Sequence, residues 1–183
     1  MPEERGLWKY CFGYTSPRLY AEVVTPPLSF VPRLEHFTPQ NVANTLWGHA
    51  VLRRVPSPAL VDASLAHTAR HVHSFDPHAL SNTLWSLATL RITDQGIFEL
   101  LAGRARDKLN EFVPQGLANM MWAFATVGHS PGGAFMDSIA EEAMRRPLLV
   151  FKPQELSNIL WAYATLGHHP GEAFMDHLEE ASV

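Results

Sequence analysis

The chain has 183 residues, a hydrophobic content of 46% and a formal net charge of −4. That hydrophobic content is enough for a sizeable core. The slightly acidic charge argues against a protein that coats nucleic acid non-specifically. A single cysteine, Cys11, excludes an intramolecular disulfide. No run approaches the roughly 18 apolar residues that a membrane span requires, so we expect no membrane partner.

Residues 1–36 are the least regular part of the chain. Trp8 lies 39 residues before Trp47, and a proline-rich link follows at residues 25–32. We interpret residues 1–36 as a degenerate partial repeat with its link. Because neither end shows a polar capping repeat, we expect the chain to be part of a longer array.

From residue 37 onward one block of sequence occurs four times. The pattern Phe-x-Pro-x-x-(Leu/Val)-(Ala/Ser)-Asn-x-(Leu/Met)-Trp begins at Phe37, Phe75, Phe112 and Phe151. A fixed period of 37 to 39 residues is typical of stacked supersecondary units. The predicted repeats are residues 37–74, 75–111, 112–150 and 151–183.

Each repeat is predicted to form two helices. The first begins near the proline of the block, because proline is favoured in a first helical turn, and it ends in the third and fourth copies at a Gly-His signal followed by proline. The second helix is expected at about residues 58–73, 96–109, 133–146 and 172–183. No segment alternates like a half-buried strand. We therefore predict an all-α fold, a right-handed α-solenoid of paired antiparallel helices.

The first helix of each repeat has an apolar stripe. With the tryptophan as position 0, apolar or small residues recur at positions −5, −4, −1, 0 and +3. These positions span about 140°, the width of a buried stripe, so we expect the tryptophans to pack between helices. We expect positions −6, −3, −2 and +1 to face solvent. Position +1 is always small, which would let a flat ligand approach the backbone: Gly48, Ser86, Ala123 and Ala162.

The third and fourth copies resemble a known repeat. Residues 112–129 and 151–168 read Phe-x-Pro-Gln-x-Leu-(Ala/Ser)-Asn-x-(Leu/Met)-Trp-Ala-(Phe/Tyr)-Ala-Thr-(Val/Leu)-Gly-His, which closely resembles the octotricopeptide repeat. The first and second copies depart from it at Arg53 and Arg91, where the usual glycine is missing, so we expect a less regular turn there. The resemblance covers residues 37–183 and implies a paired-helix solenoid.

The same resemblance implies a function. Octotricopeptide repeat proteins are implied to bind single-stranded RNA with modular sequence preference, in transcript stability, processing or translation in chloroplasts or mitochondria. No transit peptide is visible in this chain, so a cytoplasmic location stays open. With about one base per repeat, the expected RNA-binding residues are Asn41, Asn44, Thr45, Asn82, Thr83, Asn119, Met120, Glu155, Asn158 and Ile159.

These residues fall into two groups. Asn41, Thr83 and Glu155 vary between copies and are expected to read bases by hydrogen bonds, whereas Met120 could only pack against a base. The asparagine at position −3 is the same in all four copies, so it cannot distinguish bases. It either bonds backbone at a helix–helix seam or contacts a repeated element such as a sugar or phosphate.

The arginines and histidines offer two further kinds of candidate site, for phosphate and for a metal ion. Candidate phosphate contacts are Arg54, Arg104, Arg106, Arg145 and Arg146, although cations late in a helix also suit its dipole. His67, His71 and His73 are the best candidate metal cluster, but they lack carboxylate support, so solvated helix surface is the better interpretation and no metal is expected. No catalytic or cofactor motif is present, so we expect neither an enzyme nor a cofactor. The alternative function is a protein-binding scaffold, favoured by the acidic net charge and by apolar Met120 and Ile159.

Overall fold

The protein is described by a computed structural model that covers residues 36–180. This part of the chain contains eight α-helices and no strand, which confirms the all-α prediction. The predicted partial repeat at residues 1–36 lies outside the described residues apart from residue 36. The helices are α2 (Pro39–Val51), α3 (Pro58–His71), α4 (Pro77–Thr89), α5 (Gln95–Arg106), α6 (Pro114–Val127), α7 (Gly133–Met144), α8 (Pro153–Leu166) and α9 (Glu172–Glu180).

Each proline of the repeated block occupies the first turn of a helix, as expected from its missing N–H group. The residue before it is the N-cap. Thr38 Oγ1 accepts a hydrogen bond from the Asn41 N–H at 3.3 Å, and Asn41 Oδ1 accepts one from the Thr38 N–H at 2.9 Å. Asp76 Oδ1 accepts from the Ala79 N–H at 2.7 Å. These caps fix where α2 and α4 begin.

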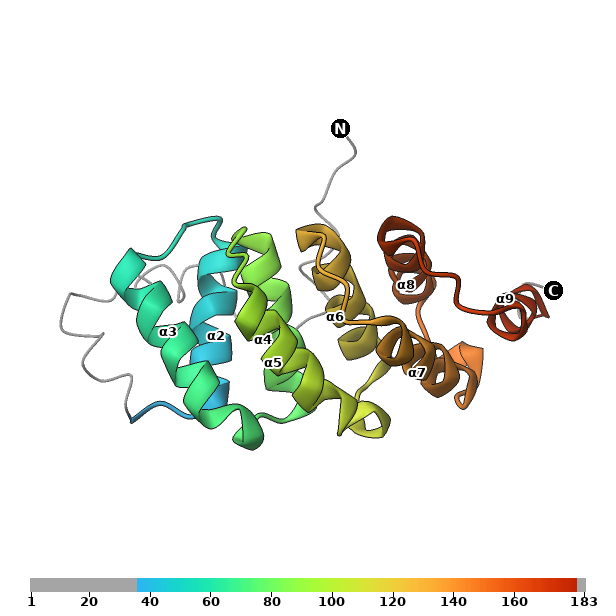
Figure 1. Ribbon diagram of the computed structural model, residues 1–183, viewed down its shortest axis with the longest axis horizontal. Coiled ribbons are helices and arrows are strands. Elements are labelled where there is room, and N and C mark those ends of the chain that lie inside the picture. Colours follow the sequence, from blue (N-terminus) through green and yellow to red (C-terminus); the bar gives the residue numbers. More distant parts are fainter. Residues whose placement is uncertain (1–35, 181–183) are drawn as a thin grey trace.

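The helices form two layers of four (Figure 1). We call α2, α4, α6 and α8 the A helices, and α3, α5, α7 and α9 the B helices. Each A helix packs along the next one, from α2 to α4, to α6 and to α8, and these are the most extensive helix contacts among the described residues. Smaller contacts join α3 to α2 and α5 to α4 within a pair, and α3 to α5 and α7 to α9 within the B layer. The molecule is therefore elongated along the direction in which the pairs succeed one another.

The core lies between the layers and at the seams between A helices. One large apolar side chain at the matching place of each B helix is buried: Leu60, Phe98, Phe135 and Phe174. The phenylalanines that open the second, third and fourth blocks are also buried: Phe75, Phe112 and Phe151. Each of them follows a short 3-10 turn, η3 (Val72–Ser74), η4 (Leu109–Glu111) or η5 (Leu148–Val150), which links one helix pair to the next.

The four A helices end in the same turn. Gly128 and Gly167 have φ values of 69° and 68°, and Arg53 and Arg91 have φ values of 51° and 59° at the equivalent positions. In every copy the N–H after this residue bonds the carbonyl five residues before it, as in His129 to Phe124 and Ile92 to Leu87. This is the Schellman pattern. The expectation of a less regular turn in the first two copies is therefore wrong.

Candidate nucleic-acid interface

The exposed edge of the A layer is set by positions −7, −3 and 0, which share one helix face. It carries an amide or imidazole, an asparagine and a tryptophan on each A helix. We call these residues the A-layer ridge: Gln40, Asn44 and Trp47 on α2; His78, Asn82 and Trp85 on α4; Gln115, Asn119 and Trp122 on α6; Gln154, Asn158 and Trp161 on α8. All of them are partly or fully exposed except Asn82, which is 6% exposed.

Hydrogen bonds connect the ridge at its α2–α4 end. Gln40 Nε2 donates to Asn44 Oδ1 at 2.8 Å. Asn82 Nδ2 lies 3.2 Å from His78 Nε2, and His78 Nδ1 lies 3.4 Å from Gln40 Oε1. A neutral His78 with its proton on Nδ1 satisfies both contacts, because Nε2 then accepts from Asn82 and Nδ1 donates to Gln40. This end of the ridge is therefore a linked polar network.

The α6–α8 end of the ridge differs. Within residues 36–180 the side chains of Asn119 and Asn158 make no hydrogen bond, although both are partly buried. In none of the four copies does the asparagine side chain bond backbone among the described residues, which removes one of the two roles considered for it. Asn119 and Asn158 thus present free amide groups, each with two donors and an acceptor.

A pocket of about 270 Å³ opens between the N-terminal halves of α4 and α6. Its polar lining comes from Asp76, His78, Ser81, Asn82, Glu111, Gln115 and Asn119. Asp76 is engaged as the cap of α4, and Glu111 forms an ion pair with Lys108 Nζ at 2.9 Å. The volume is near the lower end of small-molecule sites, about 300–1,000 Å³. The pocket therefore admits a group the size of one planar ring system rather than a large cofactor.

The expected packing of tryptophans between helices is confirmed for Trp85 and Trp122, but none of the four tryptophans in residues 36–180 is fully buried. Trp161 is 47% exposed, and the other three are partly exposed. The rings of Trp85 and Trp122 lie 6.3 Å apart between centroids at an interplanar angle of 33°. Trp85 of α4 and Trp122 of α6 thus pack across the seam between their helices while part of each ring stays open to solvent. This arrangement leaves aromatic surface next to the asparagines.

The predicted ligand-facing positions −6, −2 and +1 form the seam between A helices instead. Thr83, Met120 and Ile159 are fully buried, and Glu155 is 8% exposed with its Oε2 accepting from the Lys152 N–H at 2.8 Å. Their predicted exposure is wrong. All four small residues at position +1 are buried as well, because small side chains here let the neighbouring helix approach closely rather than a ligand.

At the α2 end the predicted residues are more accessible. Asn41 and Asn44 are exposed and Thr45 is partly exposed. However, Asn41 is occupied in the capping box of α2, and Thr45 Oγ1 donates to the Asn41 carbonyl at 2.8 Å. Of the ten predicted residues, the structure brings only the four asparagines at position −3 onto the ridge. Sequence analysis missed position −7, although it is polar in all four copies.

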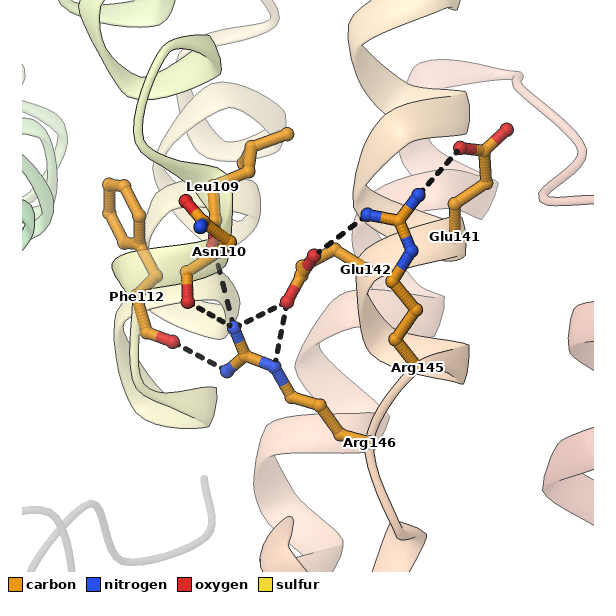
Figure 2. A network of polar contacts seen from close by, with 7 residues as sticks. All are labelled: Leu109, Asn110, Phe112, Glu141, Glu142, Arg145 and Arg146. Atoms are coloured by element: carbon orange, nitrogen blue, oxygen red, sulfur yellow. Dashed lines mark hydrogen bonds and ion pairs between the residues drawn. The ribbon is translucent and has the colours of Figure 1, made fainter.

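Two of the predicted phosphate contacts have structural roles. Arg146 is 16% exposed, and its guanidinium binds the Phe112 carbonyl, the Asn110 carbonyl at 3.4 Å and Glu142 Oε1 at 2.7 Å (Figure 2). Arg104 Nη2 likewise donates to the His73 carbonyl at 2.8 Å. Both arginines tie the end of a B helix to the preceding 3-10 turn. Their expected availability for phosphate is therefore wrong.

The remaining predicted cations are exposed. Arg145 lies 3.3 Å from Glu142 and 3.9 Å from Glu141, which offset its charge (Figure 2). Arg106 covers the Phe135 ring at 5.5 Å, and Arg54 lies in the turn after α2. A phosphate role for these three stays a prediction.

The three histidines differ: His71 and His73 are exposed, as expected, whereas the expected solvation of His67 is wrong. His67 is 1% exposed, and its Nε2 lies 2.8 Å from the Phe37 carbonyl. Burial, with smaller contributions from His71 and Arg70, lowers its pKa against the opposing effect of the Phe37 hydrogen bond. Over residues 36–180 no group of three His, Cys, Asp or Glu side chains is arranged to hold a metal ion. None of the helices in this range is long and apolar enough to cross a membrane.

Comparison with known families bears on the α4–α9 part of the chain. A family model described as "Tbc2 translation factor, N-terminal domain" matches residues 88–182, just over half of the sequence. The chain belongs to this family. The Tbc2 N-terminal domain match begins at the end of α4 and includes the ridge residues of α6 and α8. No curated protein matches the chain.

Proposed function

We propose that this chain is an α-solenoid of about four octotricopeptide-type repeats that binds single-stranded RNA with sequence preference. The process served is translation, in a chloroplast or mitochondrion. Membership of the Tbc2 translation factor family supports the process, and the repeated Phe-x-Pro…Asn-x-x-Trp block supports the repeat type. The proposal assigns the chain no catalytic step and no cofactor.

The observation that carries the proposal is the A-layer ridge. Single-stranded RNA offers flat bases that stack on aromatic side chains and base edges that bond amides. The ridge supplies both groups once per A helix, with neighbouring helix axes expected about 8–10 Å apart. A ligand with one base per repeat matches this periodicity, and the pocket between α4 and α6 has room for one ring system.

The ridge also changes which side chains are expected to act. Trp122 and Trp161 supply stacking surfaces, and Asn119 and Asn158 supply unpaired amides beside them. At the other end, the bonded Gln40–His78–Asn82 network presents a fixed set of donors and acceptors. Position −7 differs between copies, with histidine on α4 and glutamine on the others, so it is the ridge position best suited to distinguish bases.

Binding to a randomised pool of single-stranded RNA, with single-stranded DNA as competitor, tests the proposal. Replacing Trp161 with alanine should weaken binding by about 5- to 150-fold, since stacking contributes about 1–3 kcal/mol per base. Asn119→Ala should weaken binding by about fivefold, as expected for one neutral hydrogen bond of about 1 kcal/mol.

The matched control is Asn110→Ala, which removes an exposed amide from η4, outside the A helices. We expect its RNA affinity to equal that of the parent chain. Absence of any enriched RNA, or equal competition by DNA, would contradict the proposal. If Asn110→Ala and Asn119→Ala changed the RNA affinity equally, the ridge would not be the RNA-binding surface.

A second candidate function is binding of an extended protein segment. The observation that favours it is the pocket lining, which contains the carboxylates of Asp76 and Glu111 and no lysine or arginine. Such a pocket suits a basic side chain, and the asparagines of the ridge could bond a peptide backbone. Titration with a panel of basic peptides in the absence of RNA separates the two functions: saturable peptide binding that Asn119→Ala weakens, with no RNA enrichment, would favour the scaffold.

A further inference from the structure

Two arginines occupy backbone positions that favour glycine. Arg53 and Arg91 are the residues of positive φ other than glycine within residues 36–180, at 51° and 59°. Each ends an A helix in the Schellman turn that Gly128 and Gly167 form in the third and fourth copies. The same turn therefore contains glycine, which favours positive φ, in two copies and arginine, which does not, in the other two.

The left-handed conformation has a cost for arginine. A side chain with a Cβ is strained there, and among residues other than glycine only asparagine, aspartate and histidine are markedly enriched in it. A cation near a helix C-terminus does gain from the dipole, but that gain does not require a left-handed residue. In the first copy, the next residue, Arg54, could make the same favourable interaction with the helix dipole from an ordinary backbone conformation. Residues in strained backbone conformations cluster at functional sites, so the two arginines suggest a functional role.

Both arginines lie just after the C-terminal ends of adjacent A helices. They are exposed, and they follow α2 and α4, two A helices that pack along each other. Arg91 comes two residues after the last residue of α4, and Arg53 two residues after the last of α2. Their spacing along the chain is the repeat period, so they project from equivalent points of adjacent A helices.

We propose that Arg53 and Arg91 bind phosphates of the RNA backbone at the α2–α4 end of the ridge. This inference rests on the proposed function and deepens it. Guanidinium groups bind phosphate through paired N–H donors. Two of them one repeat apart match a backbone that presents phosphates at regular intervals. The RNA is then anchored by charge at α2 and α4, and by stacking and free amides at α6 and α8.

Replacing both arginines with glycine should change the stability of the fold and the affinity for RNA in opposite directions. In the Arg53→Gly/Arg91→Gly double variant, glycine relieves the strain, so the melting temperature should rise. RNA affinity should fall, and it should fall more at 50 mM than at 200 mM salt. The slope of log K against log salt should decrease in magnitude by about 1.4, or about 0.7 per lost contact to a single strand. Sequence preference should be unchanged, because phosphate contacts carry no base information.

Two further variants serve as controls. Arg70→Ala removes one exposed cation from α3 in the B layer, and it should leave the salt slope unchanged. Gly128→Arg places an arginine in the same turn after α6, where a Cβ meets no atom within 4 Å. It should lower the melting temperature and increase the salt slope by about 0.7.

The outcomes distinguish this inference from the proposed function. If the parent chain binds RNA and the double variant keeps its affinity and salt slope, the phosphate role of Arg53 and Arg91 is overturned while RNA binding stands. If the parent chain binds no RNA, both are overturned. A reduced slope in the double variant, with an unchanged slope in Arg70→Ala, supports the inference.

Discussion

At the scale of single residues, Arg146 and Arg145 are adjacent arginines with opposite surroundings. Arg146 is 16% exposed and its partner Glu142 is 8% exposed, whereas the Arg145 side chain is 69% exposed. Arg146 also bonds three carbonyls of the preceding turn, those of Leu109, Asn110 and Phe112. Two arginines next to each other in the sequence therefore have different roles, and the difference in their burial explains why.

We predict that Arg146→Ala destabilises the protein by about 3 kcal/mol, because it leaves the Glu142 carboxylate buried with only an exposed partner and frees three carbonyls. Arg145→Ala should cost less than about 1 kcal/mol, as exposed ion pairs do. Urea denaturation followed by circular dichroism measures both. Equal losses for the two variants would show that the network in Figure 2 does not hold α7 to η4.

His67 gives a prediction on pH. Its Nε2 hydrogen-bonds the Phe37 carbonyl, and its Nδ1 is buried without a partner, so the neutral ring with the proton on Nε2 fits the site. Burial lowers the folded-state pKa below the ordinary value of 6.5. The unfolded chain then binds more protons than the folded chain, and stability is lost as pH falls through and below 6.5.

The measurement compares the parent with His67→Gln, whose amide can still donate to Phe37. The difference in unfolding free energy between them should be largest above pH 6.5 and should shrink on acidification. A difference that stays constant from pH 8 to pH 5 would mean that His67 titrates normally in the fold.

At the scale of elements, Met120 tests whether position −2 of an A helix is buried against its neighbours or faces a ligand. Met120 is fully buried where α6 packs on its neighbours. Met120→Ala should therefore cost about 3 kcal/mol through lost packing and a cavity. Met144→Ala, the same change at a partly buried site on α7, should cost clearly less. If Met120 instead faced a base, its replacement would reduce RNA affinity with little change in the urea midpoint.

Helix boundaries were predictable because their signals are local. The first-turn prolines, the Thr38 and Asp76 caps and the Gly128 and Gly167 turns act within a few residues, and the observed helices begin and end close to the expected positions. The turn geometry at Arg53 and Arg91 was not predictable, because the helix hydrogen bonds of the repeat impose it on a residue that does not favour it.

The predicted apolar stripe at positions −5, −4, −1 and +3 is buried in the first three copies, but the opposite side of the A helices is largely buried too. Tryptophan was counted with the apolar stripe, but an indole is large enough to contact a neighbouring helix and remain partly exposed. The small residues at position +1 suggested clearance for a ligand, and close helix packing produces the same pattern. The contacts of α8 with α6 show which interpretation holds, since Ile159 and Ala162 are buried there. Trp161 is exposed on the other side of α8, where no A helix of the described residues packs.

At the scale of the whole molecule, the helix pairs differ in how many neighbours they have. Among the described residues, α4 and α6 each pack against an A helix on both sides, whereas α8 packs along α6 alone. The outer face of α8 carries Ser157, Trp161 and Ala164, all exposed. The equivalent face of α6 carries buried Ala118 and Ala125 with partly exposed Trp122. In a stacked array each unit is stabilised by its own contacts and by those with its neighbours.

Amide hydrogen exchange should reveal this arrangement. We predict the slowest exchange in α4 and α6 and the fastest in α8 and α9 of the 183-residue chain, because local opening requires less free energy where fewer buried contacts are broken. Mass spectrometry of peptides from each helix gives the order directly. Uniform protection across the four pairs would mean that the chain unfolds as one cooperative unit. RNA binding along the whole ridge should slow exchange most at α8, since the pair that opens most readily has the most protection to gain.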